Sequence, residues 1–216
     1  KRNLRVISQL REKITDYRIL IILQSINPSL SSKLTRYNLG NRGNGPVTGT
    51  LYVPSLIAES NVLNLFQGKI QDFVKALTYT KSNNNAIISC GSLEKIPIPN
   101  SSIDYIFTDP PFGWNLNYSE LNFIWESWFK VFTNNKPEAI VSTIQRKGLS
   151  EYQDLMERCF AECYRILKPG RWMTVVFHNS HNAVWNAIQE ALLRAGFIVA
   201  DVRTLDKKQG SFKQVT

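Results

Sequence analysis

Residues 101–128 read SSIDYIFTDPPFGWNLNYSELNFIWESW, and this stretch decides the fold prediction. Its apolar run Ile103–Thr108 is typical of a β-strand, and the strand is expected to end at Asp109. Two prolines and an aromatic residue follow at once, giving Asp109-Pro110-Pro111-Phe112. In open α/β sheets, ligands bind at the carboxyl ends of the strands. The stretch therefore predicts a strand that presents a polar turn to a ligand.

Around this strand, the sequence predicts strands and helices in alternation. Lys168-Pro169-Gly170 ends the first long helical pattern, and Gly196 stands just after the second, where a helix commonly closes. Short connections between such elements favour a three-layer α/β domain with a largely parallel sheet. The predicted elements are Ala86–Cys90 (strand), Ile103–Thr108 (strand), Glu151–Leu167 (helix), Arg171–His178 (strand), Asn182–Ala195 (helix) and Phe197–Leu205 (strand).

The first eighty residues have a different pattern. Lys1–Ile26 and Asn61–Leu77 carry apolar residues at helical spacing, and each predicts one helix. Asn38–Pro54 is rich in Gly, Asn and Pro, which predicts an irregular loop with one short strand at Thr50–Val53. We therefore expect an N-terminal helical and loop segment over residues 1–80 and an α/β core over residues 81–216.

The composition is that of a globular protein with a basic surface. Of the 216 residues, 43 % are hydrophobic, and the formal net charge is +9. A basic surface raises the local concentration of polyanions, which is compatible with a nucleic-acid partner. The longest apolar run, Ile19–Leu23, is far shorter than the roughly 20 residues of a membrane span, and no signal peptide is evident. No membrane association is expected.

The three cysteines indicate a reducing compartment. Cys90, Cys159 and Cys163 are an odd number and have no disulfide-framework spacing. Cys159 and Cys163 lie four residues apart on a predicted helix, where they are expected to be buried core thiols rather than metal ligands. No metal site is predicted, since His178 and His181 alone do not supply enough ligands.

The Asp-Pro-Pro-Phe turn has a chemical interpretation. An exocyclic amine on a nucleobase is a poor nucleophile, because its lone pair is delocalised into the ring. The Asp109 carboxylate and the Pro110 carbonyl can accept both amine protons and direct the lone pair at a methyl donor. Pro110 and Pro111 stiffen the turn, and Phe112 offers an aromatic face on which a flipped base can stack. The alternative is an ordinary turn opened by Asp-Pro.

The sequence resembles the amino-methyltransferase family, whose members carry a D/N/S-PP-Y/F motif after the fourth strand. GSLEKIP at 91–97 and PNSSIDYIFTDPPFG at 99–113 look like that family's third and fourth motifs. YRILKPGRWMTVVFHN at 164–179 resembles the helix and fifth strand of class I methyltransferases. The resemblance covers about residues 86–205 and is closest to bacterial DNA methylases that modify adenine N6 or cytosine N4.

This resemblance implies a class I (Rossmann-like) three-layer sandwich and S-adenosyl-L-methionine (AdoMet) as cofactor. It places Asp109, Pro110, Pro111 and Phe112 in catalysis, and Ser92, Leu93 and Asp109 at the cofactor. Target-base or nucleic-acid contacts are expected from Phe112, Asn115, Tyr118 and His178, and from the loop cations Lys207, Lys208 and Lys213. Further candidate phosphate contacts are Arg36, Arg42, Arg146 and Lys147.

Two departures from the family pattern concern the cofactor. The glycine-rich loop F-x-G-x-G is not present, and GNRGNG at 40–45 is interpreted as a flexible loop because no strand leads into it. Cys90-Gly91 stands where the family often has Gly-Asp. The chain begins at Lys1 and ends at Thr216, so a fragment is expected, with the glycine loop upstream or, in a permuted motif order, downstream.

The leading hypothesis is an AdoMet-dependent DNA methyltransferase acting on an exocyclic base amine by base flipping, with adenine N6 first and cytosine N4 second. RNA base amino-methylation is one alternative, and a nucleic-acid-binding subunit with a degenerate methyltransferase fold is another. A cytoplasmic, nucleoid-associated bacterial protein and a restriction–modification setting are expectations by family analogy. The sequence does not indicate the oligomeric state.

Overall fold

A computed structural model describes residues 2–26, 35–36, 45–46, 55, 60–79, 86–114 and 117–204. The chain divides into two compact units, each considered by itself below. The first comprises residues 1–89 and 117–138, and the second comprises residues 90–116 and 139–216. The predicted strand at Thr50–Val53 lies outside the described residues. None of the described helices is long and apolar enough to cross a membrane.

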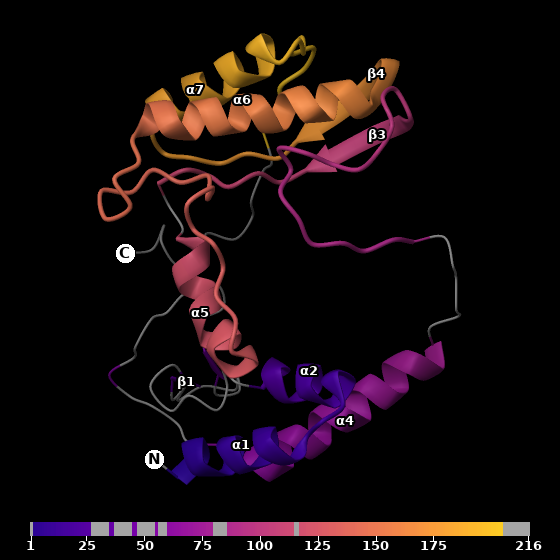
Figure 1. Cartoon of the computed structure of the whole chain (residues 1–216), viewed down its shortest axis with the longest axis vertical. Helices are drawn as coiled ribbons and strands as arrows, with labels where there is room; N and C mark the ends of the chain where they lie inside the picture. Colours follow the sequence, from indigo (N-terminus) through magenta and orange to yellow (C-terminus); the bar gives the residue numbers. More distant parts are fainter. Residues whose placement is uncertain are drawn as a thin grey trace. The chain divides into compact units, whose positions relative to one another are not determined.

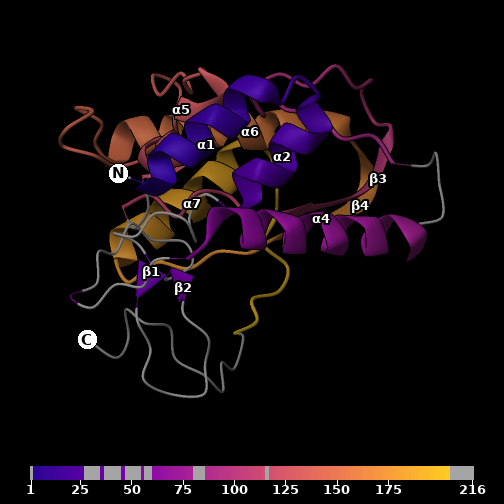
Figure 2. The same cartoon turned by 90° about the horizontal axis from the view of Figure 1, so that it is seen from below.

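The first unit contains four described helices, namely α1 (Arg2–Lys13), α2 (Tyr17–Ser25), α4 (Val62–Tyr79) and α5 (Tyr118–Phe129). Figure 2 shows α1 and α2 alongside α4. The buried side chains of Ile7, Leu23 and Val62 form its core, and Trp128 of α5 packs against them. The short strands β1 (Thr35–Arg36) and β2 (Gly45–Pro46) pair antiparallel.

The prediction of one helix over Lys1–Ile26 is wrong, because the chain breaks between α1 and α2. Asp16 has an extended backbone, and its carboxylate accepts the N–H of Arg18 over 2.8 Å, so it caps a new helix. The helix predicted at Asn61–Leu77 is confirmed as α4, and the Asn61 side chain accepts the N–H groups of Leu63 and Asn64 at its start.

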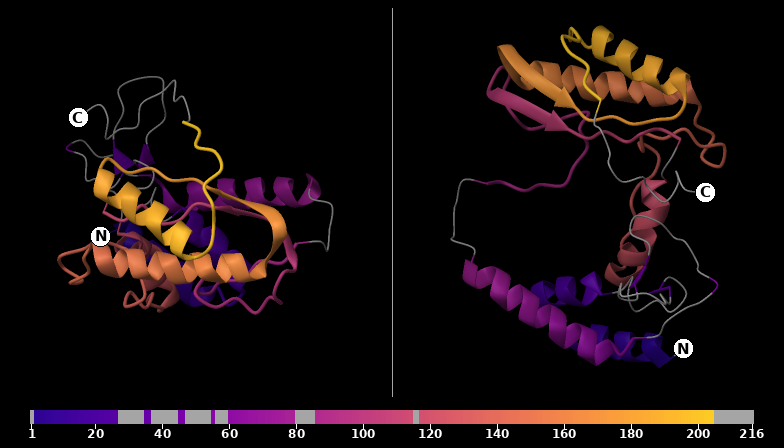
Figure 3. Two further views of the ribbon diagram at one scale, coloured as in Figure 1. Left: turned by 90° about the horizontal axis from the view of Figure 1, so that it is seen from above. Right: turned by 180° about the vertical axis from the view of Figure 1, so that it is seen from behind.

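The second unit is a mixed α/β structure built on a parallel pair of strands, β3 (Ile103–Thr108) and β4 (Leu167–Val175). Helices α6 (Leu149–Ile166) and α7 (Asn182–Arg194) pack together beside this pair (Figures 1 and 3). The predicted strand Ile103–Thr108 and both predicted helices are confirmed. The predicted strand Arg171–His178 corresponds to β4, which begins and ends earlier along the chain.

The register of β3 and β4 is irregular near its start. Ile103 lies opposite Leu167, but Tyr105 lies opposite Trp172, so extra residues of β4 bulge out around Gly170, where φ is +72°. Lys168-Pro169-Gly170 thus ends α6 as predicted and also forms this bulge. From Tyr105 onward, the ladder is regular to Thr108 and Val175.

Two predicted strands are wrong. Ala86–Cys90 has no regular secondary structure, and the side chains of Ile87 and Ile88 are both 97 % exposed. Phe197–Leu205 has none either, as far as it is described, to Thr204. A strand requires a hydrogen-bonded neighbour, and among the described residues no other strand pairs with these segments. The sheet described in this unit therefore has two strands.

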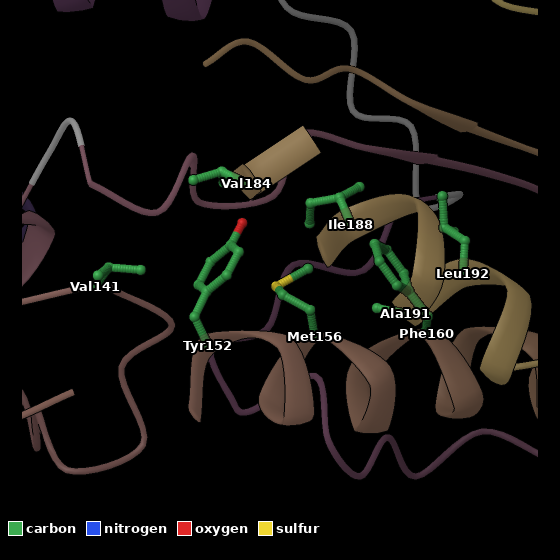
Figure 4. Close-up of a cluster of buried hydrophobic side chains, with 8 residues drawn as sticks. All are labelled: Val141, Tyr152, Met156, Phe160, Val184, Ile188, Ala191 and Leu192. Carbon is green, nitrogen blue, oxygen red and sulfur yellow. The ribbon is translucent and has the colours of Figure 1, made fainter. Parts of the chain in front are cut away.

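The core of the second unit lies between α6 and α7. Figure 4 shows Tyr152, Met156 and Phe160 of α6 facing Val184, Ile188 and Leu192 of α7. The apolar residues of β4 and of the segment after it, Met173, Val175 and Phe177, pack against the same cluster. Full burial of a side chain such as Phe160 or Ile188 stabilises the fold by about 1.5–3 kcal/mol. Strand β4 therefore links this core to β3, with which it pairs.

Candidate functional site at the end of β3

The Asp-Pro-Pro-Phe turn leaves β3 directly at its carboxyl end, as predicted. The carbonyl of Thr108, the last residue of β3, accepts the N–H of Val176 over 2.9 Å, which extends the ladder one step beyond β4. Asp109 is exposed and Pro110 is buried, while Pro111 and Phe112 are half-buried. The carboxylate therefore faces solvent at the edge where ligands bind in α/β sheets, and the proline ring behind it is fixed by packing.

The backbone carbonyls of Pro111 and Phe112 each accept a hydrogen bond from a side chain on, or just before, one of the helices α6 and α7. The hydroxyl of Tyr152, on α6, donates to the carbonyl oxygen of Pro111 over 2.6 Å. The Nδ2 of Asn179, just before α7, donates to the carbonyl oxygen of Phe112, also over 2.6 Å. Sequence reasoning missed both contacts. It placed Tyr152 only within the predicted helix Glu151–Leu167, and it named His178 but not Asn179 as a site residue.

Asn179 joins the turn to the start of α7. Its Oδ1 accepts the N–H of His181 over 2.7 Å, and its backbone carbonyl accepts Nε1–H of Trp185 over 2.9 Å. These partners define the amide orientation, because only Oδ1 can accept an N–H and only Nδ2 can donate to a carbonyl. His181 is the N-cap residue of α7. Both polar atoms of the Asn179 side chain are thus hydrogen-bonded.

Gly113 closes the turn against the core. Its φ is +79°, and a Cβ at this position would lie 3.2 Å from Cγ1 of Val184 and 3.6 Å from Cζ of Tyr152. Gly113 also forms a parallel bridge with Ile140. A side chain would therefore meet both a strained backbone and a filled space.

The rings of Phe177 and His178 contact the ring of Phe112. Its ring lies edge to face against Phe177 at 5.5 Å between centroids and against His178 at 6.5 Å, and Phe177 meets Trp185 in the same way at 5.0 Å. Such edge-to-face pairs contribute about 0.5–1.5 kcal/mol beyond area burial. The structure therefore brings together Asp109, Phe112 and the exposed His178, three of the predicted site residues.

Asp109 and Pro110 differ from the two residues that follow them. Within the part of the chain that the structure describes, no hydrogen bond reaches the Asp109 carboxylate or the Pro110 carbonyl, whereas the carbonyls of Pro111 and Phe112 are occupied. The turn therefore contains two occupied acceptors and two that have no hydrogen-bond partner among the described residues.

Two of the three predicted cofactor residues, Ser92 and Leu93, lie on the segment before β3. The Ser92 hydroxyl donates to Glu94 and accepts the Glu94 N–H, both over 3.3 Å. Glu94 pairs with Arg158 of α6 over 2.8 Å, so this segment is tied to the helix. The Leu93 side chain is partly exposed.

Two further predicted site residues lie on other segments of the chain. Tyr118 begins α5 in the first unit, and Arg146 is exposed in a tight turn of the second.

Among the described residues, no group of three or more His, Cys, Asp and Glu could hold a metal ion. Cys159 and Cys163 are buried free thiols, as predicted. The predicted contacts of Asn115, Arg42, Lys207, Lys208 and Lys213 and the side chain of Arg36 lie outside the described residues.

Comparison with known protein families decides the class of protein. The model of the DNA methylase family, which covers N6-adenine and N4-cytosine enzymes, matches residues 103–216. The chain belongs to the DNA methylase family. The match begins at the first residue of β3 and includes Asp109, Tyr152 and Asn179. No curated protein and no solved structure matches the chain.

Membership in the DNA methylase family confirms the predicted resemblance and indicates the general activity, which is methyl transfer to an amino group of a DNA base. Members generally use AdoMet. The match does not extend to Ser92 and Leu93 or to helices α1, α2 and α4.

Proposed function

We propose that this DNA methylase transfers a methyl group from AdoMet to the N6 of adenine in DNA, with the N4 of cytosine as the second choice. The observation that carries the proposal is the division of acceptors in the turn after β3. Pro111 and Phe112 have their carbonyls engaged by Tyr152 and Asn179, and the Asp109 carboxylate and the Pro110 carbonyl precede them. Two neighbouring acceptors match the two protons of an exocyclic amine.

The proposed chemistry needs only hydrogen bonds from the protein. When the Asp109 carboxylate and the Pro110 carbonyl accept both amine protons, the nitrogen lone pair is directed away from the ring and toward the methyl group. AdoMet, when bound, supplies a methyl group already activated by a positive sulfonium. As the new N–C bond forms, the bond from the methyl group to sulfur would break, with its electron pair left on sulfur. The amine becomes cationic and releases one of its two protons to solvent. The nearby Asp109 carboxylate stabilises that developing charge.

The residues present fit this cofactor in charge and polarity. The exposed Asp109 carboxylate complements a sulfonium, and Ser92 and Leu93 offer a hydroxyl and a partly exposed apolar side chain for the rest of AdoMet. We propose that a flipped base contacts the rings of Phe112 and His178, which lie edge to face against each other. Asn115, Tyr118, Lys207, Lys208 and Lys213 remain proposed contacts to DNA.

The wider architecture belongs to the same proposal. The β3–β4 pair with α6 and α7 supports a class I three-layer sandwich, of which residues 81–216 would form part and residues 1–80 a separate helical segment. A family member with this fold would bind its ligands at the carboxyl end of β3, where Asp109 lies.

Methyl transfer to separated substrates tests the proposal. The protein is incubated with labelled AdoMet and either DNA or RNA, and the nucleosides are identified by mass. We expect N6-methyldeoxyadenosine, lost in Asp109→Ala and partly retained in Asp109→Asn, because the amide keeps one acceptor oxygen. Asp104→Ala is the matched control, since Asp104 is an exposed carboxylate on β3 that pairs with Lys168 over 2.9 Å.

The products distinguish the alternatives. N4-methyldeoxycytidine would change the target base and keep the enzyme class, and label in RNA alone would overturn the DNA assignment. If a folded protein binds DNA but transfers no methyl group to either nucleic acid, the enzyme proposal fails. A nucleic-acid-binding subunit would then be the better description.

A further inference from the structure

We propose that Tyr152 and Asn179 are positioning residues that fix the direction of the Asp109 and Pro110 acceptors toward the base amine. This inference rests on the proposed function of the turn. Neither side chain is available to a substrate, because Tyr152 is 1 % exposed and Asn179 is 5 % exposed. Their effect on catalysis is therefore transmitted through the backbone of the turn.

The prolines explain why the turn requires donors from elsewhere. Pro110 and Pro111 have no N–H, so two consecutive residues cannot donate hydrogen bonds to hold the turn. A residue that precedes proline is restricted to extended backbone, which constrains Asp109 and Pro110. Pro111 and Phe112 do not precede proline, so their ψ angles lack this restriction. These are the two residues whose carbonyls accept hydrogen bonds from Tyr152 and Asn179.

The four residues of the turn are thus fixed by two complementary means. The following prolines constrain positions 109 and 110, and the two buried donors constrain positions 111 and 112. The two donors come from different segments of the chain, since Tyr152 lies in the first turn of α6 and Asn179 precedes α7. Both hydrogen bonds are short, at 2.6 Å, and both lie in the same unit as the turn.

Loss of either donor should affect the chemical step more than binding. A misplacement of reacting groups by about 1 Å can slow a reaction on the order of 100-fold. We therefore expect Tyr152→Phe and Asn179→Asp each to lower kcat by roughly 10-fold to 100-fold, with little change in the Kd for AdoMet or DNA. Tyr152→Phe keeps the ring in the core, and Asn179→Asp keeps the acceptor for the His181 N–H.

The Asn179→Asp variant provides a readout that a purely structural role would not produce. An ionised carboxylate at position 179 cannot donate to the Phe112 carbonyl, whereas a protonated carboxyl group can. Burial raises the pKa of a carboxyl group, so the carboxyl group introduced at position 179 should become protonated within the pH range of the assay. The ratio of variant to wild-type kcat should therefore rise as the pH falls, while the ratio for Tyr152→Phe stays flat.

A second measurement does not depend on activity. Hydrogen exchange of the peptide that contains residues 109–114 reports the N–H groups of Asp109, Phe112, Gly113 and Trp114, because the two prolines contribute none. We expect faster exchange in both variants and no change in Tyr164→Phe. Tyr164 is the matched control, a half-exposed tyrosine of α6 that packs against Phe197.

The two readouts separate the inference from the proposed function. Unchanged exchange in both variants, or unchanged kcat with only a lower free energy of unfolding, would overturn the positioning role. If the wild type transfers no methyl group, the proposed function fails, and the exchange data alone then decide whether Tyr152 and Asn179 hold the turn. Faster exchange together with a selective loss of kcat supports both.

Discussion

Glu138 binds Ser119 at the start of α5, 19 residues away along the chain. The carboxylate accepts the backbone N–H of Ser119 over 2.9 Å and its hydroxyl over 2.7 Å. The N-cap residue Asn117 makes no side-chain capping bond, so Glu138 supplies the acceptor that the helix start requires. A negative charge there also interacts favourably with the helix dipole.

Glu138→Ala should lower the free energy of unfolding by about 1 kcal/mol, as expected for loss of a helix cap. Urea unfolding followed by far-ultraviolet circular dichroism measures this change. Ser119→Ala is the matched control, because it removes the hydroxyl contact and keeps the backbone N–H contact, so its effect should be smaller. An equal or larger effect of Ser119→Ala would contradict the capping role.

Gly113→Ala should destabilise the second unit by about 1–2 kcal/mol, the usual cost of a left-handed backbone with a side chain. The new methyl group would also press on Val184 and Tyr152. We expect a lower melting temperature and reduced methyl transfer. Gly91→Ala serves as control, since no atom lies within 4 Å of its added Cβ. Wild-type stability of Gly113→Ala would show that the turn has room to move.

Glu162 should contribute to the free energy of unfolding, and this contribution should be lost at acid pH. A side-chain hydrogen bond from Arg165 and the N–H of Ile96 lower the pKa of Glu162 from 4.5 to about 2. This contribution is fully present above pH 4.5 and is lost as the pH falls toward 2. In Glu162→Gln, the free energy of unfolding should fall less steeply across that window. Parallel pH profiles in the two proteins would contradict this assignment.

Cys159 and Cys163 should resist alkylation in the folded protein. Burial is the main cause that raises the pKa of each thiol to about 11, so the reactive thiolate is scarce at pH 8. Mass spectrometry after brief iodoacetamide treatment should show modification of the exposed Cys90 first, and of all three cysteines only in denaturant. The same burial stabilises the fold below pH 9, and this contribution is lost as the pH rises toward 11.

Elements with a long periodic pattern were predictable from the sequence. The apolar face of α6 and the glycine after α7 predicted both helices, and Gly196 indeed has a φ of +100°. The apolar runs at 86–90 and 197–204 look equally strand-like, but a strand forms only with a partner, and an isolated run does not reveal one. The break between α1 and α2 depends on one capping side chain, Asp16, inside a continuous apolar pattern.

The two proposed acceptors of the candidate site were predictable from the sequence, whereas the side chains that hydrogen-bond to the turn were not. Asp109 and Pro110 are adjacent, so the motif itself carries their chemistry. Tyr152 and Asn179 meet the turn across 41 and 67 residues of chain, and nothing local to either residue marks such a contact. Tyr152 was predicted only as part of the helix at Glu151–Leu167, and Asn179 stands two residues before the N-cap residue His181.

The first unit has a further consequence, because α5 is inserted from the middle of the chain. Residues 117–138 belong with residues 1–89, and Gln24 and Arg11 donate side-chain hydrogen bonds to the carbonyls of Trp125 and Trp128 in α5. A chain cut near residue 89 would therefore leave two fragments that share one folded unit. Expressed separately, such fragments should reassemble without a covalent link, because the contacts that join α5 to α1 and α2 are hydrogen bonds and apolar packing.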